Sequence, residues 1–289
     1  MPTIIITGSS GLVGSGLVSH FSKLGFQVRA FQRGPKNGNH LVTYYPFDLA
    51  DVQDNGFEGA DYIVHCAYRP VISRYDRELG VNIDIEGTSK IITLAIKYGI
   101  KIVFLSTLSA HSAAKSYYAK NKLLAERLFD THKDLILKIG IVIGNGGGLF
   151  GRIISNLKKH KIIPLIGGGK QYTQTIALDD LCRIIEIGIK QNITGSFKIS
   201  HPNSITTKEL YHEIADSIGT RCLFISVPLG VVYQLVRFIE CMGFKLPFTS
   251  ENILGLKDLR VFNTTTDLER FGVTVKNYKV TLEQLKEHI

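Results

Sequence analysis

Short apolar runs alternate with amphipathic stretches through the first half of the chain. The apolar runs cover Thr3–Thr7, Gln27–Phe31, Asp61–Ala67, Lys101–Ser106 and Leu135–Ile143, and the helical patterns cover Leu12–Leu24, Asp84–Tyr98 and Tyr117–Phe129. Runs that are apolar throughout, rather than at every second position, are typical of strands in a parallel sheet covered on both faces. With right-handed crossovers, this order predicts an α/β fold, a Rossmann-type doubly wound parallel sheet.

The second half of the chain is less regular. Glycine clusters occur at Gly146–Gly148 and Gly167–Gly169, and helical patterns follow over Asp179–Lys190, Thr207–Ile218 and Leu229–Met242. No internal repeat or low-complexity linker separates the two halves, so a second unit should pack on the first rather than hang from a tether. We expect a Rossmann domain over residues 1–145, to which a strand or helix returns from about 170–200, and a small C-terminal α/β portion over 146–289.

A glycine-rich turn joins the first strand to the first helix, with the sequence Thr7-Gly8-Ser9-Ser10-Gly11-Leu12-Val13-Gly14. Its first glycine permits a tight turn, its second lets backbone approach a pyrophosphate, and its third lets the helix pack closely. The helix N-terminus offers unpaired N–H groups and a partial positive charge to the anion. We therefore predict dinucleotide binding by Gly8, Ser10, Gly11, Leu12, Val13 and Gly14, against the alternative of a glycine-rich turn that only caps a helix.

The GxxGxxG spacing of this turn differs from the GxGxxG of other dinucleotide-binding families and is the spacing of short-chain dehydrogenases/reductases. His65-Cys66-Ala67 resembles the HxA segment of their extended branch, and Asp48-Leu49 resembles the acidic pair that holds the adenine ring. Later segments that also match are Leu137–Gly144, Ala177–Leu181 and Phe262–Gly272. The chain thus resembles the extended (or atypical) short-chain dehydrogenases/reductases, the NAD-dependent epimerase/dehydratase family, over nearly its whole length and most specifically in the first half. The resemblance implies that Asp48, Leu49, Cys66 and Ala67 contact the cofactor.

The end of the second strand bears on which nicotinamide cofactor is bound. NAD selection usually needs a carboxylate there, but Gln32 occupies the place, Arg33 follows, and the first acidic residue of the chain is Asp48. A guanidinium can bind a 2′-phosphate through two hydrogen bonds, whereas a carboxylate would repel it. We predict NADP, with Arg33 on its phosphate and NAD as the alternative. The plain structural interpretation is a solvated arginine before the turn Gly34-Pro35.

Tyr118 and Lys122 stand four residues apart in a helical pattern, which places both side chains on one helix face. A phenol with a pKa of about 10 is a poor base at neutral pH, and a nearby ammonium favours the phenolate. In the family that the chain resembles, the lysine also holds the nicotinamide ribose. Tyr117 has Asn121 four residues on, so it cannot fill the same role.

The strand before this helix ends in Ser106-Thr107, which matches the family's hydroxyl that steadies the substrate carbonyl. We align Thr107 with that hydroxyl and keep Ser106 as the alternative. The predicted catalytic residues are therefore Thr107, Tyr118 and Lys122, of which Tyr118 and Lys122 would also contact the cofactor.

Several positions depart from the family pattern. Only ten residues lie between Thr107 and Tyr118, a loop shorter than in sugar-nucleotide epimerases and similar to the atypical branch related to a complex I accessory subunit, some members of which are not enzymes. Lys138-Ile139 replaces the usual Arg-Pro, and Asp84 stands where asparagine commonly precedes Gly87-Thr88. These changes leave the predicted cofactor site intact and weaken any substrate assignment.

Other candidate groups are weighed against ordinary structural roles. His111 could touch substrate or simply face solvent, and Arg152 could hold a diphosphate or lie at the surface. Asp179 and Asp180 fit a helix cap better than an acid/base pair. No His/Cys/Asp/Glu cluster has metal-ligand spacing.

Composition narrows the class further. With 289 residues, 44% hydrophobic and 20% charged, the chain is not disordered. Its net charge of +9 suits anionic cofactors and substrates better than nucleic acid, because basic residues are not interleaved with aromatic ones. Four scattered cysteines and an N-terminus without signal-peptide layout predict a cytoplasmic protein. The stretch Ile225–Phe244 is apolar but carries Arg237 and Glu240, so it predicts an amphipathic helix and no integral membrane segment.

These features predict an NAD(P)-dependent oxidoreductase that reduces a keto group on a nucleotide-linked sugar, with 146–289 as the substrate-binding portion. Tyr118 would protonate the developing alkoxide, Thr107 would hydrogen-bond it, and Lys122 would support both phenol and ribose. The alternatives are a sugar-nucleotide epimerase/dehydratase that retains NAD, a non-catalytic dinucleotide-binding subunit, and a membrane-surface enzyme acting on a lipid. The sequence leaves open whether the chain forms a homodimer.

Overall fold

The computed structural model describes residues 1–69, 74–244 and 249–286, with backbone only for 74–82. The first half of the chain contains β1 (Thr3–Thr7), α1 (Leu12–Lys23), β2 (Gln27–Gln32), β3 (Val42–Pro46), β4 (Tyr62–His65), α2 (Arg74–Tyr98), β5 (Lys101–Thr107), α3 (Tyr117–Glu126) and β6 (Leu135–Ile139). Next come β7 (Ile141–Ile143), α4 (Gly148–Lys159), β8 (Ile162–Ile166), the 3-10 turn η1 (Gly167–Gly169), β9 (Tyr172–Thr173), β10 (Thr175–Ala177), α5 (Leu178–Lys190) and β11 (Gly195–Ile199). The chain continues through β12 (Ile205–Thr206), α6 (Thr207–Ser217), β13 (Leu223–Val227), α7 (Leu229–Cys241), α8 (Ser250–Lys257), α9 (Thr265–Glu269) and α10 (Tyr278–Leu285).

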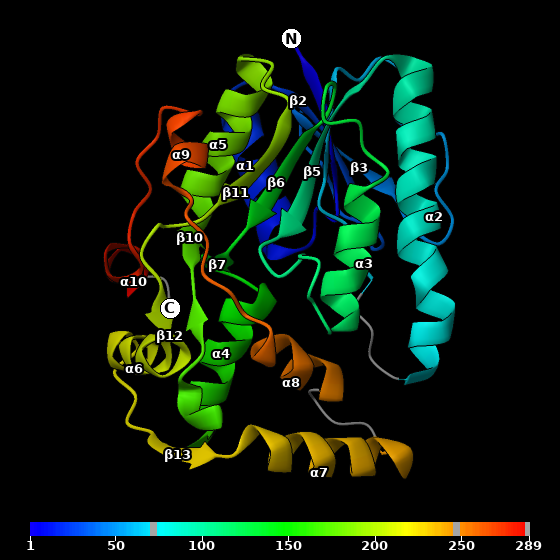
Figure 1. Ribbon diagram of the computed structural model, residues 1–289. Helices are drawn as coiled ribbons and strands as arrows, with labels where there is room; N and C mark the ends of the chain where they lie inside the picture. The colour runs from blue at the N-terminus through cyan, green and yellow to red at the C-terminus, as the bar shows by residue number, and fades with distance from the viewer. Residues whose placement is uncertain (70–73, 245–248, 287–289) are drawn as a thin grey trace.

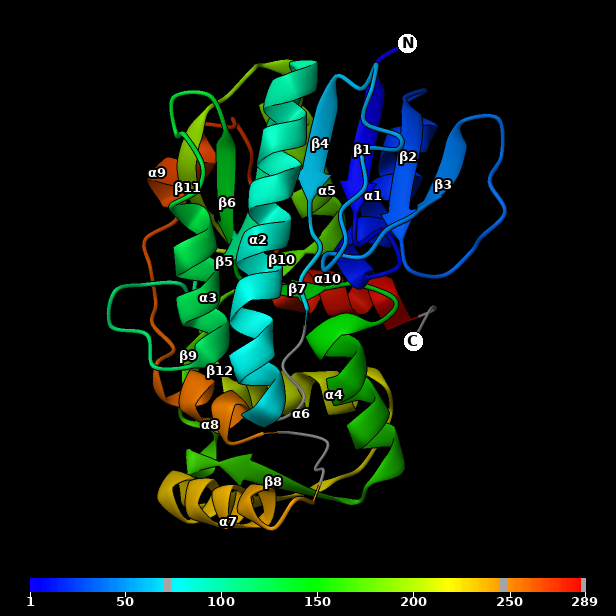
Figure 2. The same cartoon turned by 90° about the vertical axis from the view of Figure 1, so that its right-hand side faces the viewer.

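A seven-stranded parallel sheet forms the centre of the molecule, in the order β11-β6-β5-β4-β1-β2-β3 (Figure 1). Its strands are buried on both faces: Ile4 and Ile6 pack with α1 and α5, while Ile5 packs with α2 and α3 on the other side (Figure 2). The near-continuous apolar runs arise from this double coverage. The predicted doubly wound Rossmann fold is confirmed.

The apolar run over 135–143 does not form one strand. It divides at Gly140 into β6, which stays in the main sheet, and β7, which pairs with β10 instead. A Cβ atom on Gly140 would lie 2.5 Å from the carbonyl oxygen of Gln174, so only glycine allows the two backbones to meet there. The chain later returns to the main sheet, where α5 packs on α1 and β11 pairs with β6.

Most of the remaining second half, with α4, β8, α6, β13, α7 and α8, lies beyond the carboxyl ends of the sheet strands, whereas α9 packs beside β11 (Figures 1 and 2). It has its own apolar core, in which Phe150 and Leu157 of α4 meet Ile163 of β8 and Leu210 and Ile214 of α6. Ligands of doubly wound sheets bind at the carboxyl edge of the sheet, so a site is expected there. Within the described residues, no helix combines the length and apolar character needed to cross a bilayer.

Candidate active site

The turn between β1 and α1 brings backbone close to the end of β4. Gly8 adopts a φ of +67°, and a Cβ there would lie 3.0 Å from Ala67 Cα, so the position excludes a side chain. The amide of Gly11 donates to the Gly8 carbonyl at 2.9 Å, which closes the turn. Helix α1 then begins without a side-chain cap, so its first N–H groups stay available to an anion.

The third glycine of the turn packs against the first. A Cβ on Gly14 would lie 2.2 Å from the Gly8 carbonyl oxygen, so any larger residue would displace the loop. Beside it, Leu12 packs under Gly146 and Gly148 at the start of α4, which brings the second half of the chain against the loop. The residues present therefore fit a dinucleotide diphosphate: close backbone, an uncapped helix start, and no side chain in the way.

A buried hydrogen-bond network ties the turn to β4. Thr7 Oγ1 accepts from the amides of Cys66 and Ala67 at 3.1 Å each and lies 2.8 Å from His65 Nδ1. Because that oxygen already accepts two bonds, its proton goes to Nδ1, and His65 Nε2–H donates to Thr88 Oγ1 at 3.1 Å. Burial, with a smaller contribution from the Lys122 charge, lowers the pKa of His65 to about 3. His65 is thus a neutral structural link rather than a proton donor.

The end of β2 presents an amide in place of a carboxylate. Gln32 is buried, accepts from Ser9 Oγ at 3.2 Å and donates to the Gly34 carbonyl at 2.8 Å, so its polar atoms are already engaged. Arg33 is exposed and makes no hydrogen bond or ion pair with any described residue. Asp48 is also exposed and accepts from the Ala50 amide at 2.9 Å in a local turn.

Thr107 and Tyr118 come together at the carboxyl edge of β5. The Thr107 side chain lies close enough to the Tyr118 phenol to lower its pKa, although ten residues separate the two along the chain. The Tyr118 side chain is 39% exposed, and its ring meets Tyr68 edge to face at 4.9 Å. Burial raises the pKa of the Tyr118 phenol, the Thr107 side chain lowers it, and the charge of Asp84 raises it. The phenol is therefore held in its protonated form.

Lys122 is buried one helical turn from Tyr118. Its ammonium donates to the Leu105 carbonyl at 2.9 Å and lies 4.7 Å from the centre of the Phe104 ring. Burial lowers the pKa of Lys122 to about 8, against the opposing charge of Asp84. The sequence interpretation had the ammonium lowering the pKa of the phenol. In the structure Lys122 is not among the groups that shift the pKa of Tyr118, because its charge is turned toward β5.

Asp84 is a buried carboxylate whose charge acts on Tyr117 and Tyr118. Its carboxylate accepts from the Arg69 amide at 2.9 Å and from Asn121 Nδ2 at 2.8 Å. Its charge raises the pKa of Tyr118 and that of Tyr117, which burial raises to about 12 in the first place. The residue that departs from the family pattern thus adds a negative charge whose effect reaches both tyrosines.

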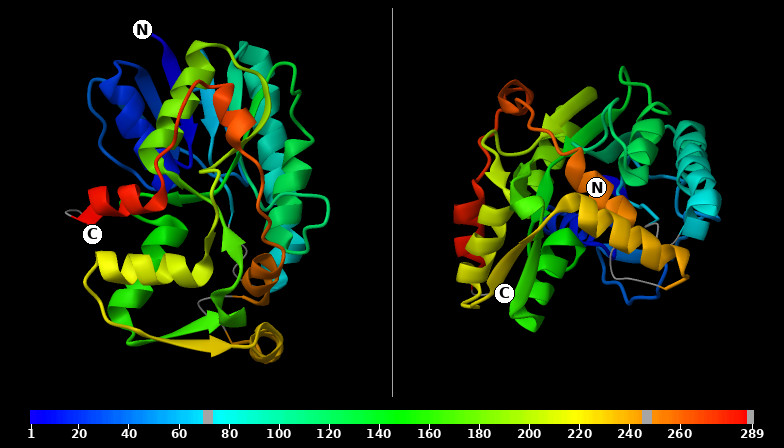
Figure 3. Two further views of the ribbon diagram at one scale, coloured as in Figure 1. Left: turned by 60° about the vertical axis from the view of Figure 1, so that its left-hand side comes forward. Right: turned by 60° about the horizontal axis from the view of Figure 1, so that its bottom comes forward.

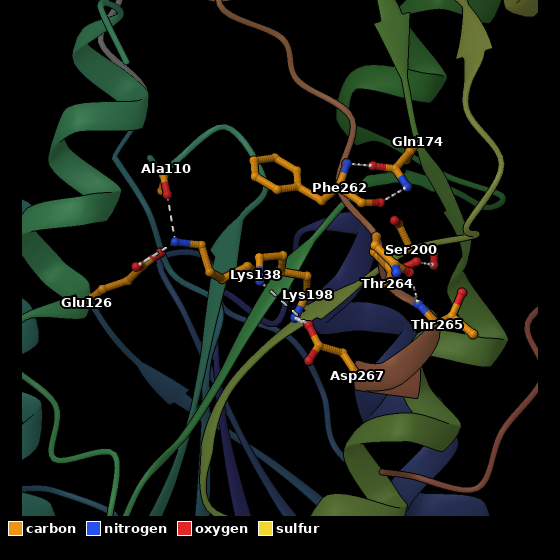
Figure 4. A network of polar contacts seen from close by, with 11 residues as sticks. Ala110, Glu126, Lys138, Gln174, Lys198, Ser200, Phe262, Thr264, Thr265 and Asp267 are labelled. Atoms are coloured by element: carbon orange, nitrogen blue, oxygen red, sulfur yellow. Dashed lines mark hydrogen bonds and ion pairs between the residues drawn. The ribbon is translucent and has the colours of Figure 1, made fainter. Parts of the chain in front are cut away.

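Ser106, the alternative to Thr107, is engaged elsewhere. It is buried and its hydroxyl donates to a carboxylate oxygen of Glu126. The other oxygen of Glu126 lies 2.8 Å from Lys138 Nζ, which also donates to the Ala110 carbonyl at 2.6 Å (Figure 4). The geometry therefore favours Thr107, and Lys138, where the family pattern has arginine, ties α3 to β6 and to the loop before Tyr118.

That loop is closed from outside by the C-terminal part of the chain. Asp258 Oδ2 accepts from the Lys115 amide at 2.6 Å, its carbonyl lies 3.0 Å from His111 Nε2, and Glu251 Oε2 accepts from the Tyr117 amide at 2.6 Å. His111 is therefore partly buried against this segment, not solvent-facing, and its Nδ1 has no partner among the described residues.

The segment itself is held by Gln174. The buried Gln174 amide donates to the Phe262 carbonyl at 2.9 Å and accepts from the Phe262 amide at 2.9 Å (Figure 4). No sequence signal marked Gln174, Glu251 or Asp258, since each acts on a partner more than 80 residues away.

The remaining candidates lie apart from this site. Asp179 and Asp180 occupy the first turn of α5 but do not cap it; both carboxylates bind Lys276 instead. Arg152 is exposed on α4 near Tyr211. A cavity of about 630 Å³ is lined by η1 and α6 and contains none of the predicted site residues.

The fold and the glycine turn define a Rossmann-fold dinucleotide-binding protein of the short-chain dehydrogenase/reductase type. The sequence pattern of the NAD dependent epimerase/dehydratase family matches residues 4–196, more than half of the chain. The chain belongs to this family.

Among curated relatives, the chain is 24% identical over 281 residues to NADH dehydrogenase [ubiquinone] 1 alpha subcomplex subunit 9, mitochondrial, of Arabidopsis thaliana, covering 90% of this chain and 69% of that protein. It is 24% identical over 253 residues to UDP-glucuronic acid decarboxylase 1 of the same plant, covering 74% of this chain and 58% of the relative.

Solved structures show the same fold. Human epimerase family protein SDR39U1 with NADPH superposes with a TM-score of 0.77 at 17% identity, over 99% of this chain and all of that one. UDP-glucose 4-epimerase of Thermotoga maritima with UDP-glucose gives a TM-score of 0.75 at 17% identity, over 99% of this chain and 98% of that one.

Proposed function

We propose that the protein is an NAD(P)-dependent oxidoreductase of the extended short-chain dehydrogenase type that reduces a keto group on a nucleotide-linked sugar. The observation that carries the proposal is the placement of Tyr118 beside Thr107, which lowers the pKa of its phenol, at the carboxyl edge of β5, with the glycine turn over 8–14 on the same edge of the sheet. A proton donor and a diphosphate cradle on one sheet edge suit reduction of a carbonyl beside a bound nicotinamide.

The chain's own residues supply the proton and the alignment, while a bound nicotinamide would supply the hydride. Tyr118 keeps its proton at neutral pH, because burial and the Asp84 charge raise its pKa, and it can release that proton to an oxygen that becomes negative. Thr107 would donate a second hydrogen bond to that oxygen. Lys122 would turn from the Leu105 carbonyl toward the ribose hydroxyls, and its buried ammonium would favour the proton transfer.

We propose NADP as the cofactor, with NAD as the alternative. Arg33 is exposed and free of partners among the described residues at the end of β2, and Gln32 provides no negative charge. A 2′-phosphate beside Arg33 would gain a charge-assisted pair and meet no carboxylate repulsion. Among the structural neighbours, the human protein SDR39U1 carries NADPH and the protein MoeE5 carries NAD, so both choices occur on this fold.

The substrate proposal rests on the part of 146–289 that includes α4, β8, α6 and α7, which lies over the carboxyl edge of the sheet. Several relatives and neighbours are named for UDP-sugar epimerisation or decarboxylation. We therefore assign residues 146–289 mainly to substrate binding. The variant of this proposal is an epimerase/dehydratase that keeps NAD bound through turnover.

A non-catalytic dinucleotide-binding subunit is the second candidate. It is favoured by the short loop before Tyr118, which Asp258 and Glu251 hold through backbone amides, and by the Arabidopsis relative, whose name makes it a subunit of a larger assembly. On this reading the cofactor would stabilise the fold, and Tyr118 would serve no proton transfer.

Replacing Tyr118 with Phe separates the two candidates, with Tyr117→Phe as the matched control. We expect Tyr118→Phe to lower the rate of hydride transfer from NADPH to a panel of UDP-4-keto sugars by about 10²–10⁴-fold, with the dissociation constant for NADPH nearly unchanged. Tyr117→Phe should keep most of the rate. NADPH binding without turnover on the whole panel would favour the subunit, and failure to bind either dinucleotide would refute both.

We propose a homodimer in which α2 and α3 meet their copies, because these adjacent helices expose Ile96 and Leu124, and Leu128 is exposed just after α3. Sedimentation velocity tests the assembly. A reducing, cytoplasmic compartment is proposed on the cysteines, all four of which are free: Cys66, Cys182, Cys222 and Cys241.

A further inference from the structure

Helix α7 lies at the end of the molecule far from the N-terminus (Figure 3, left), and it exposes an apolar stripe. Its exposed large side chains recur at helical spacing and consist of Val231, Leu235, Phe238 and Met242, followed by Phe244, with Phe238 64% exposed. The opposite side of α7 packs inward, where Val236 is buried and Glu240 accepts two hydrogen bonds from Ser250 of α8. A surface helix normally exposes polar residues, whereas α7 buries one side and still exposes an apolar stripe on another.

The β8–β13 pair, whose second strand leads into α7, also exposes apolar side chains. Ile163 and Phe224 point into the core beneath the pair, while the alternate positions Ile162, Leu223 and Ile225 are exposed. Leu223 is 62% exposed and pairs with Ile162 in register, so the two side chains lie together. A strand face turned to water normally carries polar residues, so an apolar outer face needs a partner. We call the exposed side chains of α7, β8 and β13 the α7 face.

Basic residues are frequent in the segments that carry the α7 face. Segments 153–166 and 220–244 contain five basic residues, Lys158, Lys159, Lys161, Arg221 and Arg237, and one acidic residue, Glu240. The carboxylate of Glu240 is engaged by Ser250, and Lys161 adjoins Leu223 through the backbone bond from the Leu223 amide to the Lys161 carbonyl. An apolar surface with positive charges beside it is complementary to a partner that has an apolar interior and an anionic outer layer.

A second copy of the chain fits this surface poorly. A two-fold contact would set the same five basic residues of each copy against one another, which costs energy at the contact. The helix also protrudes at the end of the molecule (Figure 3), and a protruding helix suits a flat partner better than a groove-filling peptide. An interfacial helix with Phe, Leu and Val on one side and Lys or Arg beside it is the pattern that lies at a membrane surface.

We propose that the α7 face docks on an anionic lipid bilayer, with the apolar side chains in the acyl boundary and the basic residues against the headgroups. The proposal concerns location and does not depend on the proposed oxidoreductase activity. Each basic residue near an anionic surface and each apolar side chain in the interface would add to the affinity. Docking therefore requires both components.

Vesicle co-sedimentation of the full chain tests the proposal. We expect binding to vesicles of phosphatidylcholine with about 30 mol% phosphatidylserine and little binding to pure phosphatidylcholine, with loss of binding at high salt. Phe238→Ser should weaken binding to the mixed vesicles about tenfold or more, whereas Val280→Ser, which changes an exposed valine on α10, should not. The double variant Lys159→Glu/Lys161→Glu should lose binding, and Lys23→Glu/Lys90→Glu should keep it.

Three results would overturn the proposal. The first is no co-sedimentation with anionic vesicles. The second is binding that Phe238→Ser leaves unchanged, which would make the attraction non-specific charge. The third is a Phe238→Ser variant that turns a dimer into a monomer in sedimentation velocity, which would make the α7 face a contact between copies. Circular dichroism and the melting temperature of each variant verify that it folds.

Discussion

The carboxylate of Asp84 accepts a 2.8 Å hydrogen bond from Asn121 Nδ2, which joins α2 to the helix that carries Tyr118. Both residues are buried, so the carboxylate cannot move away from the tyrosines. Its charge raises the pKa of Tyr118 and opposes the phenolate. A residue that the family pattern would have as neutral asparagine thus biases the site toward giving a proton rather than taking one.

Replacing Asp84 with Asn should move the pH dependence of ketone reduction downward. Reduction needs the protonated phenol, so the rate falls as pH rises through the pKa of Tyr118, and removing a nearby negative charge lowers that pKa. We expect the alkaline limb of kcat/KM to move to lower pH. Asp216→Asn, at an exposed position on α6, should leave the limb in place. An unmoved or upward limb would show that Asp84 does not act on the proton donor.

Replacing Arg33 with Ala should weaken the binding of NADPH and leave the binding of NADH nearly unchanged. The lost charge-assisted hydrogen bonds to a 2′-phosphate are worth about 1.5–3 kcal/mol, or roughly 10- to 100-fold in the dissociation constant. Titration of intrinsic tyrosine or cofactor fluorescence measures both constants, with Lys23→Ala as the control for net charge. Equal losses for the two dinucleotides would remove Arg33 from the phosphate site and leave NAD as the proposed cofactor.

Replacing Lys138 with Met should destabilise the protein strongly. The Lys138–Glu126 pair is nearly buried, with side chains 16% and 11% exposed, so the variant leaves a buried carboxylate with only the Ser106 hydroxyl. We expect a loss of about 3–5 kcal/mol in the free energy of unfolding at pH 7 by urea titration. The exposed pair Lys97–Asp54 supplies the control, since Lys97→Met should cost no more than about 1 kcal/mol.

The double variant Glu126→Leu/Lys138→Met should recover much of the loss. If Lys138→Met were as stable as the native protein, the ion pair between Lys138 and Glu126 would not be formed in solution.

His65 should make the protein sensitive to mild acid. Burial lowers its pKa to about 3, while in the unfolded chain it titrates near 6.5, so below pH 6.5 the unfolded chain binds a proton that the native chain does not. The free energy of unfolding therefore decreases as pH falls below 6.5, by about 2 kcal/mol at pH 5. His65→Asn should reduce the difference in unfolding free energy between pH 7.5 and pH 5. The same difference in both proteins would contradict a neutral buried His65.

Local patterns were sufficient for the sheet and for the phosphate turn. Strands such as β1 and β5 are apolar runs in the sequence because both of their faces are buried. The glycines at 8, 11 and 14 indicate a tight turn that leaves little room for side chains. The spacing of Tyr118 and Lys122 likewise follows from helix geometry alone. Such features depend on residues within one or two turns of the chain, so the sequence displays them directly.

Only the tertiary structure decided what surrounds these residues. It split the run over 135–143 at Gly140, turned Lys122 toward Leu105, set Asp84 against the tyrosines, and brought Gln174 to Phe262. Each of these depends on where the chain returns after tens of residues, and no periodicity encodes that distance. The fold class could therefore be inferred from the sequence. The position of the Asp84 charge near Tyr118, and the contacts that close the loop before Tyr118, could be seen only in the tertiary structure.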